Sequence, residues 1–222
     1  MDSTTANSID IIDLLRSKPF VHIISEPRSG STALYTALKK PTQYFDLNEP
    51  FDQAREVTGK KEQNNVKDHI LTILKKDMEF HSVMKNHAFA ILDLTDNMQE
   101  RLWQIPAFTV GLTRRDWFAQ TCSLALAEYT GKWDEQHKSS VTIPLDFFVD
   151  KFRQLLGCKN DLSQLDSHFN MLINYEDIKF PNKLDHRKVN STLSIANIQE
   201  LKQMYNHLKD THQKYWRIRD TQ

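Results

Sequence analysis

Residues 21–32 read Val-His-Ile-Ile-Ser-Glu-Pro-Arg-Ser-Gly-Ser-Thr, and a helical pattern follows them directly. The apolar residues at the start of this stretch are typical of a buried strand. Gly30 permits a tight turn, and N–H groups at the start of the next helix can converge on an oxyanion. Ser31 and Thr32 add hydroxyl groups, and Arg28 adds charged donors suited to a phosphate or sulfonate group. The stretch therefore predicts a strand, a loop that holds a tetrahedral anion, and a helix.

Short apolar runs and helical patterns alternate along the rest of the chain. The runs that favour strands are residues 20–24, 44–47, 82–85, 108–112 and 171–173. The patterns that favour helices are residues 32–39, 66–80, 96–104, 116–129, 145–156 and 195–215. Helical crossovers between strands build a mostly parallel sheet, so we expect an α/β fold with a central sheet and helices on both faces.

No repeat or linker divides the chain, so the sequence predicts a single domain over residues 1–222. Within it, residues 1–18 form an N-terminal lead-in and residues 194–222 a C-terminal helix. With 39% hydrophobic and 26% charged residues, the composition is that of a globular protein. Because 29 basic residues balance 29 acidic ones, no overall field draws the chain to nucleic acid or to a membrane. Any anion site must therefore be local.

The two cysteines, Cys122 and Cys158, provide no disulfide framework. The N-terminal residues carry neither an export signal nor an apolar stretch long enough to span a bilayer. We therefore expect a cytoplasmic protein.

A turn that caps a helix is the simpler interpretation of an isolated Ser-Gly-Ser-Thr segment, but the position after the first buried strand favours an anion site. The nucleotide-kinase alternative requires Gly, four residues, Gly, Lys and Ser or Thr. Residues 25–32 lack that pattern, and no lysine stands in the loop to reach a terminal phosphate. The commonest nucleotide-kinase interpretation is therefore disfavoured.

The loop resembles the 5′-phosphosulfate-binding loop of sulfotransferases that use 3′-phosphoadenosine 5′-phosphosulfate (PAPS). Its form in that family is Pro, Arg or Lys, Ser, Gly, Ser or Thr, Thr. The resemblance implies a P-loop-type α/β fold and PAPS as the donor co-substrate, with no metal. It also implies a set of donor-binding residues in which Arg28 neutralises charge on the leaving phosphate. These residues are Arg28, Ser29, Gly30, Ser31 and Thr32.

A second motif follows the expected strand at residues 108–112. Arg115 stands after this strand, and Ser123 lies eight residues later on a predicted helix. In the sulfotransferase superfamily, an Arg and a Ser at this spacing bind the 3′-phosphate of the donor, which is the role the resemblance implies here. Two phosphate sites together indicate a bisphosphorylated nucleotide.

Three further segments are similar to bacterial carbohydrate sulfotransferases of the trehalose 2-sulfotransferase type. They are the Glu-Pro within Asn48–Phe51, the Thr-Gly-x-Trp within Ala127–Trp133, and Tyr175–Asp177. The resemblance implies transfer of a sulfuryl group from PAPS to a hydroxyl of a carbohydrate or another small polar acceptor. No nucleic acid or membrane partner is expected, and the sequence leaves the oligomeric state open.

The resemblance offers two candidates for the base that takes the proton of the acceptor hydroxyl. Glu49 matches the glutamate base of the carbohydrate enzymes, and His87 matches the histidine in the Lys-x-His motif of cytosolic sulfotransferases. We favour Glu49 because the other similarities point to the carbohydrate group. Arg187 and Lys188 stand where cytosolic members carry a donor-binding Arg-Lys-Gly segment, but the glycine is missing, and a solvated basic turn explains them equally well.

Two alternatives to a sulfotransferase stay open. A different phosphate-handling transferase, similar to a kinase, predicts a lysine at the anion loop and carboxylates placed for magnesium. A non-catalytic relative would keep the nucleotide site and lack the chemistry.

Overall fold

A computed structural model of the protein describes residues 10–41, 46–53, 59–76, 82–133, 140–180 and 195–211. The chain forms two compact units. The first contains the residues up to Arg115 together with those from Cys158 to Asp185, and the second contains Asp116–Gly157 and the residues from His186 onwards. That both units belong to one domain stays a prediction.

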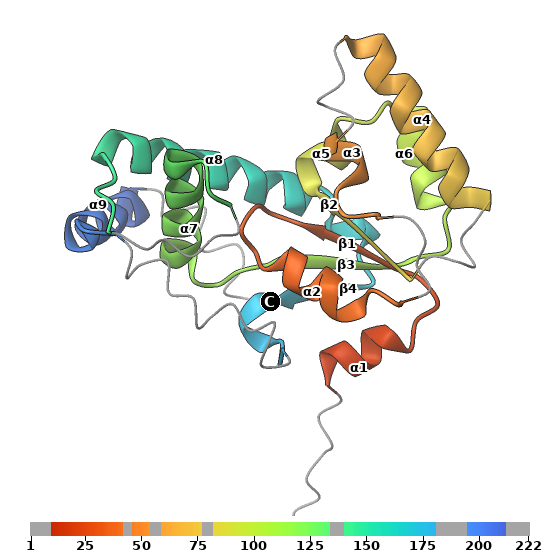
Figure 1. The fold of residues 1–222 in the computed structure, drawn as a ribbon, viewed down its shortest axis with the longest axis horizontal. Coiled ribbons are helices and arrows are strands. Elements are labelled where there is room, and N and C mark those ends of the chain that lie inside the picture. The colour runs from red at the N-terminus through yellow and green to blue at the C-terminus, as the bar shows by residue number, and fades with distance from the viewer. Residues whose placement is uncertain are drawn as a thin grey trace, which may run out of the picture. The chain divides into compact units, whose positions relative to one another are not determined.

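The first unit is built on a four-stranded parallel sheet (Figure 1). Its strands are β1 (Val21–Ser25), β2 (Val83–His87), β3 (Phe108–Thr113) and β4 (Met171–Asn174), arranged in the order β2-β1-β3-β4. All strand pairs are parallel, so the carboxyl ends of all four strands lie at the same edge. The expected α/β fold with a parallel sheet is confirmed.

Helices cover both faces of this sheet, which is the layered arrangement expected from the sequence. Val21 and Ile23 of β1 pack in one apolar cluster with α1 and α2, whereas Ile24 and its neighbour Met84 pack in another with α4, α5 and α6. Successive side chains of a strand point to opposite faces, so β1 contributes to both clusters. The helices of this unit are α1 (Ile11–Arg16), α2 (Ser31–Leu38), α3 (Pro50–Gln53), α4 (Lys60–Lys76), α5 (Ala88–Leu92) and α6 (Asp96–Trp103).

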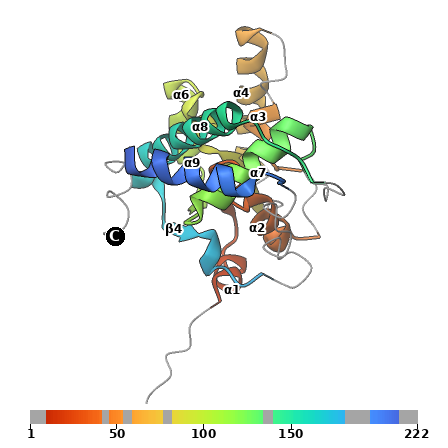
Figure 2. The same ribbon diagram turned by 90° about the vertical axis from the view of Figure 1, so that its left-hand side faces the viewer.

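The second unit is helical. It contains α7 (Trp117–Thr130), the first part of α8 (Leu145–Gln164) and α9 (Ile198–Thr211), which pack around a shared apolar core (Figure 2). Phe148 and Phe152 of α8 form part of that core together with Leu201 of α9. The last residues of α8 belong to the first unit, where Leu162 packs in the cluster on the α4–α6 face.

The expected strand at residues 44–47 is not found in its described part, Asp46 and Leu47. The chain instead makes one isolated parallel bridge, between Asn48 and Lys85 of β2. The pairing ends there because Glu49 takes a left-handed backbone conformation, with a φ of 60°, and the chain turns into α3. Tyr44 and Phe45 lie outside the described residues.

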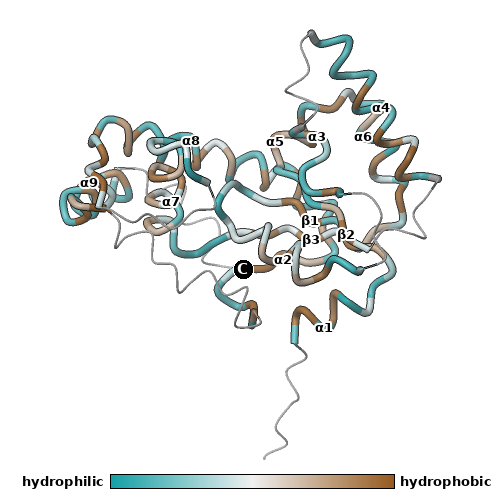
Figure 3. The backbone as a smooth tube through the Cα atoms, in the orientation of Figure 1, coloured by the Kyte–Doolittle hydropathy of each residue, from teal (hydrophilic) through white to brown (hydrophobic). Residues whose placement is uncertain are grey.

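Several helices differ in length from the expected ranges. Helix α4 begins at Lys60 rather than at residue 66, so the polar residues just before residue 66 form the first part of this helix. Figure 3 shows brown and teal segments alternating along α4, as expected for a helix with one apolar face. Helix α8 continues to Gln164, because Leu162 extends the apolar stripe beyond the expected end. No helix within the described ranges is long and apolar enough to cross a bilayer.

Candidate functional site

The loop between β1 and α2 has the backbone that an anion site requires. Arg28 and Gly30 both have positive φ angles, 58° and 85°. Gly30 is the N-cap residue of α2 and offers no side chain to cap the first N–H groups of the helix. These groups stay available to an external acceptor, and the positive end of the helix dipole favours an anion there. A non-glycine residue with positive φ is strained and often marks a functional position, so Arg28 fits the proposed role.

The hydroxyl groups of this loop fit an anionic ligand. Ser29 is fully buried, and its Oγ atom has no hydrogen-bond partner among the described residues. A buried hydroxyl without a partner is costly, and an oxygen atom of a bound anion would remove that cost. Thr32 is exposed, and its Oγ1 atom accepts a hydrogen bond from Lys85, so its own proton remains available to a ligand.

Tyr175 holds the loop from the side of β4. A Cβ atom added to Gly30 would lie 2.2 Å from the Cδ2 atom of Tyr175, so the ring packs against the glycine itself. The guanidinium of Arg114 lies over the same ring, 5.4 Å from its centre. The segment Tyr175–Asp177 therefore supports the anion loop, and its Glu176 accepts a hydrogen bond from the backbone N–H of Arg115 at 3.0 Å.

Lys85 connects the anion loop to one of the two candidate bases. Its Nζ atom donates to Thr32 Oγ1 at 2.9 Å and lies 2.5 Å from Glu49 Oε1. The Lys85 side chain is 2% exposed, so this ammonium is held by its partners and screened little by water. The loop itself lacks a lysine, but β2 places one at the hydroxyl of Thr32.

Glu49 and His87 lie side by side at the end of β2. Glu49 Oε1 lies 3.4 Å from His87 Nε2, and Asp52 Oδ2 lies 2.6 Å from His87 Nδ1. A carboxylate only accepts, so Nδ1 donates to Asp52, and in the neutral ring Nε2 carries the lone pair that faces Glu49. The two candidate bases predicted from the sequence are therefore neighbours at the end of β2, and Asp52 orients the ring of His87.

A buried ion pair lies beneath the ends of β1 and β3. Lys159 of α8 lies 3.0 Å from Glu26 Oε2, and Glu26 Oε1 accepts a hydrogen bond from the Thr113 hydroxyl at 2.7 Å. Lys159 also donates to the backbone carbonyl of Arg114 at 3.3 Å. These contacts tie the start of the anion loop to the segment that carries Arg115.

The two residues expected at the 3′-phosphate belong to different units. Arg115 lies in the first unit, where its exposed side chain is 2.5 Å from Asp177 Oδ1. Ser123 lies in α7 of the second unit and is buried. Arg187 and Lys188 lie outside the described residues. Binding of the 3′-phosphate by Arg115 and Ser123, and closure of Arg187 and Lys188 over the donor, stay predictions.

Several residues of the site carried no role in the sequence analysis. Lys85 stands in the same Lys-x-His segment as His87, so a signal for it was present. Asp52 carries a weaker signal, as a carboxylate one turn after Glu49. Nothing in the local sequence links Glu26 to Lys159, because they are 133 positions apart.

Three potential metal ligands also lie together in this site. One ligand atom from each of Glu49, Asp52 and His87 lies within 4.8 Å of the other two. Two carboxylates and an imidazole can bind a divalent cation. Lys85 is already in contact with Glu49, and its positive charge would repel such a cation.

No family model matches this chain, and no curated protein is significantly similar to it. The geometry at the carboxyl edge of the sheet is therefore the basis for a functional proposal.

Proposed function

We propose that this protein is a PAPS-dependent sulfotransferase of P-loop-type fold, which moves a sulfuryl group to a hydroxyl of a carbohydrate or another small polar acceptor. One observation carries the proposal: Lys85 Nζ contacts both Thr32 of the anion loop and the carboxylate of Glu49. A donor phosphosulfate at the loop and an acceptor hydroxyl at Glu49 would therefore be next to each other. Proximity of this kind supplies much of the rate enhancement of a transfer reaction.

The chemistry is an in-line displacement at sulfur. The base removes the proton of the acceptor hydroxyl while its oxygen bonds to sulfur, and the bond between sulfur and the bridging oxygen of the donor breaks. The leaving group is the 5′-phosphate of 3′-phosphoadenosine 5′-phosphate. Arg28, Lys85 and the N–H groups at the start of α2 stabilise the charge that develops on that phosphate.

Glu49 is the proposed base, and His87 is its alternative. The strained φ of 60° at Glu49 supports a functional role, since a glutamate gains nothing locally from a left-handed backbone. The Asp52–His87 contact supports the alternative, because it leaves the Nε2 lone pair of His87 facing the same place. Either residue can accept the proton without a change in the position of the acceptor.

A cytoplasmic location is part of this proposal. Both cysteines are buried as free thiols. Burial raises the pKa of Cys158 to about 12, which keeps its sulfur protonated and unreactive.

A metal-dependent phosphoryl transferase is the second candidate, and the cluster of Glu49, Asp52 and His87 supports it. This function would use the anion loop for a nucleoside triphosphate and the three side chains for magnesium. The Lys85–Glu49 contact argues against it, since the cation would have to displace the ammonium.

Ligand-induced thermal stabilisation separates the two candidates. We expect 3′-phosphoadenosine 5′-phosphate to stabilise the protein in the presence of EDTA, by about 2.7 kcal/mol at a hundredfold excess over its dissociation constant. ATP with magnesium should give no such effect. Stabilisation by ATP with magnesium alone would overturn the sulfotransferase proposal.

Transfer of labelled sulfate from PAPS to a panel of sugars then tests catalysis. Lys85→Met is the matched variant, because methionine keeps much of the length and loses the charge. It should lower transfer at least tenfold. If the donor binds but no acceptor is sulfated, a non-catalytic relative is the correct interpretation.

A further inference from the structure

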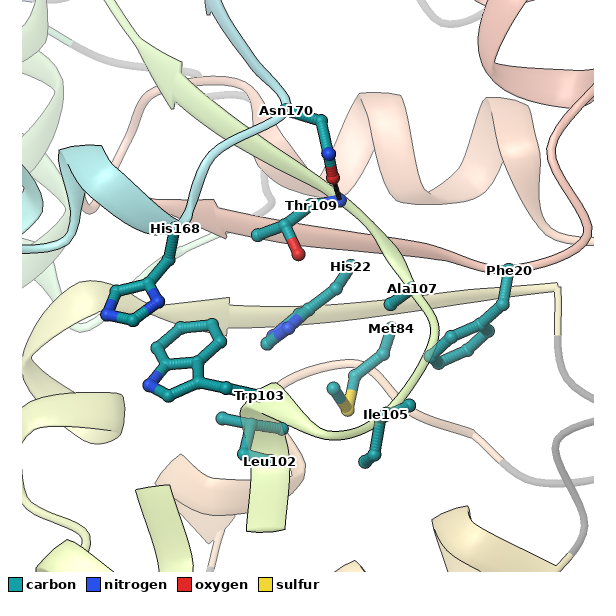
Figure 4. Close-up of a pocket in the computed structure, with 10 residues that line it drawn as sticks. All are labelled: Phe20, His22, Met84, Leu102, Trp103, Ile105, Ala107, Thr109, His168 and Asn170. Atoms are coloured by element: carbon teal, nitrogen blue, oxygen red, sulfur yellow. Dashed lines mark hydrogen bonds between the residues drawn. The ribbon is translucent and has the colours of Figure 1, made fainter. Parts of the chain in front are cut away.

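A cavity lies in the first unit, away from the anion loop (Figure 4). It is lined by residues at the amino ends of the strands, among them His22 of β1, Met84 of β2 and Thr109 of β3. The anion loop follows the carboxyl end of β1, so the cavity and the candidate active site lie at opposite edges of the sheet. Its volume is about 200 Å³. An engineered apolar cavity of about 150 Å³ binds benzene, so this space suits one or two fused rings.

Aromatic, apolar and polar side chains line the cavity. The rings of Trp103 and His168 stack with their centres 4.1 Å apart and their planes within 5° of parallel. Trp103 is also 6.5 Å from the ring of His22, measured between centres. Met84 and Ile105 close the apolar side (Figure 4). Flat aromatic walls favour a flat ligand, because stacked rings gain dispersion energy over their whole face.

Polar side chains also line this space, and two of them, His22 and Thr109, offer hydrogen-bonding groups to a ligand. His22 Nε2 accepts a hydrogen bond from the side-chain amide of Asn86 at 3.2 Å, so the proton of the neutral ring is on Nδ1. Figure 4 shows the hydroxyl oxygen of Thr109 pointing toward the space in front of His22 and Trp103. One N–H donor and one hydroxyl are therefore available to a ligand with matching groups.

Apart from two histidines, the described residues that line the cavity carry no ionisable side chain. No aspartate, glutamate, lysine or arginine is among the described residues that line it. Burial lowers the pKa of His22 to about 3, so its ring carries no charge near neutral pH. A charged ligand would lose its hydration here without gaining a counter-ion.

We propose that this cavity binds an uncharged, planar nitrogen heterocycle of one or two fused rings. A ring nitrogen accepts from Nδ1–H of His22, a ring N–H donates to the Thr109 hydroxyl, and the ring faces pack between Trp103 and the apolar wall. The site is separate from the proposed sulfuryl transfer and does not depend on it.

Benzimidazole is the probe, because it is neutral at pH 7.5 and carries both an acceptor nitrogen and an N–H. Indene has the same fused-ring shape without either group. We expect one benzimidazole to bind per chain in a calorimetric titration, with a dissociation constant of about 1 mM or tighter. Indene should bind at least about fivefold more weakly, the effect of one or two lost hydrogen bonds.

Thr109→Val keeps the branched shape and removes the hydroxyl, and should weaken benzimidazole binding about fivefold. Thr130→Val makes the same chemical change in α7 and should leave the affinity unchanged. The amide signals that shift on titration should be those of Trp103, Thr109 and their neighbours. Absence of saturable binding, equal binding by both variants, or shifts at other residues would overturn the proposal. Binding of 3′-phosphoadenosine 5′-phosphate to Thr109→Val should be unchanged, so the two proposals fail independently.

Discussion

The Nζ atom of Lys159 lies 3.0 Å from the Oε2 atom of Glu26, and the two side chains are 6% and 0% exposed. The pair joins the last part of α8 to the residue that precedes the anion loop. Glu26 also accepts from Thr113 at the end of β3, so one carboxylate positions two of the segments that carry candidate ligand-binding residues. The net stability from a buried ion pair is small, because the desolvation of both charges offsets much of their attraction.

Replacing one residue of this pair should destabilise the fold more than replacing both. Lys159→Met leaves the Glu26 carboxylate buried without its counter-ion, and we expect it to lower the free energy of unfolding by about 3–5 kcal/mol. The double variant Glu26→Gln with Lys159→Met removes both charges, so its free energy of unfolding should fall clearly less. Urea denaturation of the three proteins measures the difference. A double variant no more stable than Lys159→Met alone would show that the unpaired Glu26 carboxylate is not what destabilises the single variant.

The three glycines with contrasting surroundings should respond differently to alanine. Gly30 has a φ of 85°, and a Cβ atom added there would lie 2.2 Å from the Tyr175 ring, so Gly30→Ala meets both backbone strain and a steric clash. Gly131 has a φ of 68° with open space around it, so Gly131→Ala meets strain alone, about 1 kcal/mol. Gly157 lies inside α8 with open space, and Gly157→Ala should stabilise by about 0.5–1 kcal/mol.

Thermal or urea denaturation ranks these variants by stability. Titration with 3′-phosphoadenosine 5′-phosphate measures whether each one still binds the nucleotide. Only Gly30→Ala should weaken nucleotide binding. If Gly131→Ala weakens it equally, the close packing of Tyr175 on the loop is not what shapes the anion site.

The two candidate bases can be separated by substitution. Glu49→Gln keeps the shape of the side chain and removes the negative charge, so the turnover number should fall by about 10²–10⁴-fold. Binding of 3′-phosphoadenosine 5′-phosphate should change little. Asp52→Asn should have a smaller effect, since Asp52 acts only by orienting His87. Intact turnover in Glu49→Gln with none in His87→Ala would assign the base to His87.

His22 should make the protein less stable in acid. Its pKa is about 3 in the folded protein because burial disfavours the charged ring, against 6.5 for an unperturbed histidine. Between these two values the unfolded chain binds a proton that the folded protein does not, so stability falls as the pH falls through this window. The largest slope from one such group is about 1.4 kcal/mol per pH unit.

His22→Gln removes this titration and keeps a group that can accept from Asn86. Between pH 7.5 and 4.5 the variant should lose clearly less stability than the unmodified protein, measured by urea denaturation at both pH values. Equal losses in the two proteins would mean that the His22 ring is protonated in the folded state as well.

Much of the fold could be predicted from the sequence because its signals are local. The strand at residues 21–25 is mostly apolar, and α2 follows a glycine that ends the loop, so both were expected within about one residue. The run at 44–47 was misleading, because apolar character alone does not separate a strand from a segment that makes a single bridge. The end of α8 was missed because its last apolar residues pack in the first unit.

The sequence by itself determined that strands and helices alternate, and that a loop containing Arg28 and Gly30 follows the first strand. These follow from hydrophobic periodicity and from the backbone freedom of glycine, which act over a few neighbouring residues. Only the tertiary structure decided that Lys85 contacts Thr32, that Glu49 and His87 are neighbours, and that Glu26 pairs with Lys159. Such contacts depend on which strands are neighbours and on their register, and these are settled by packing across the whole sheet.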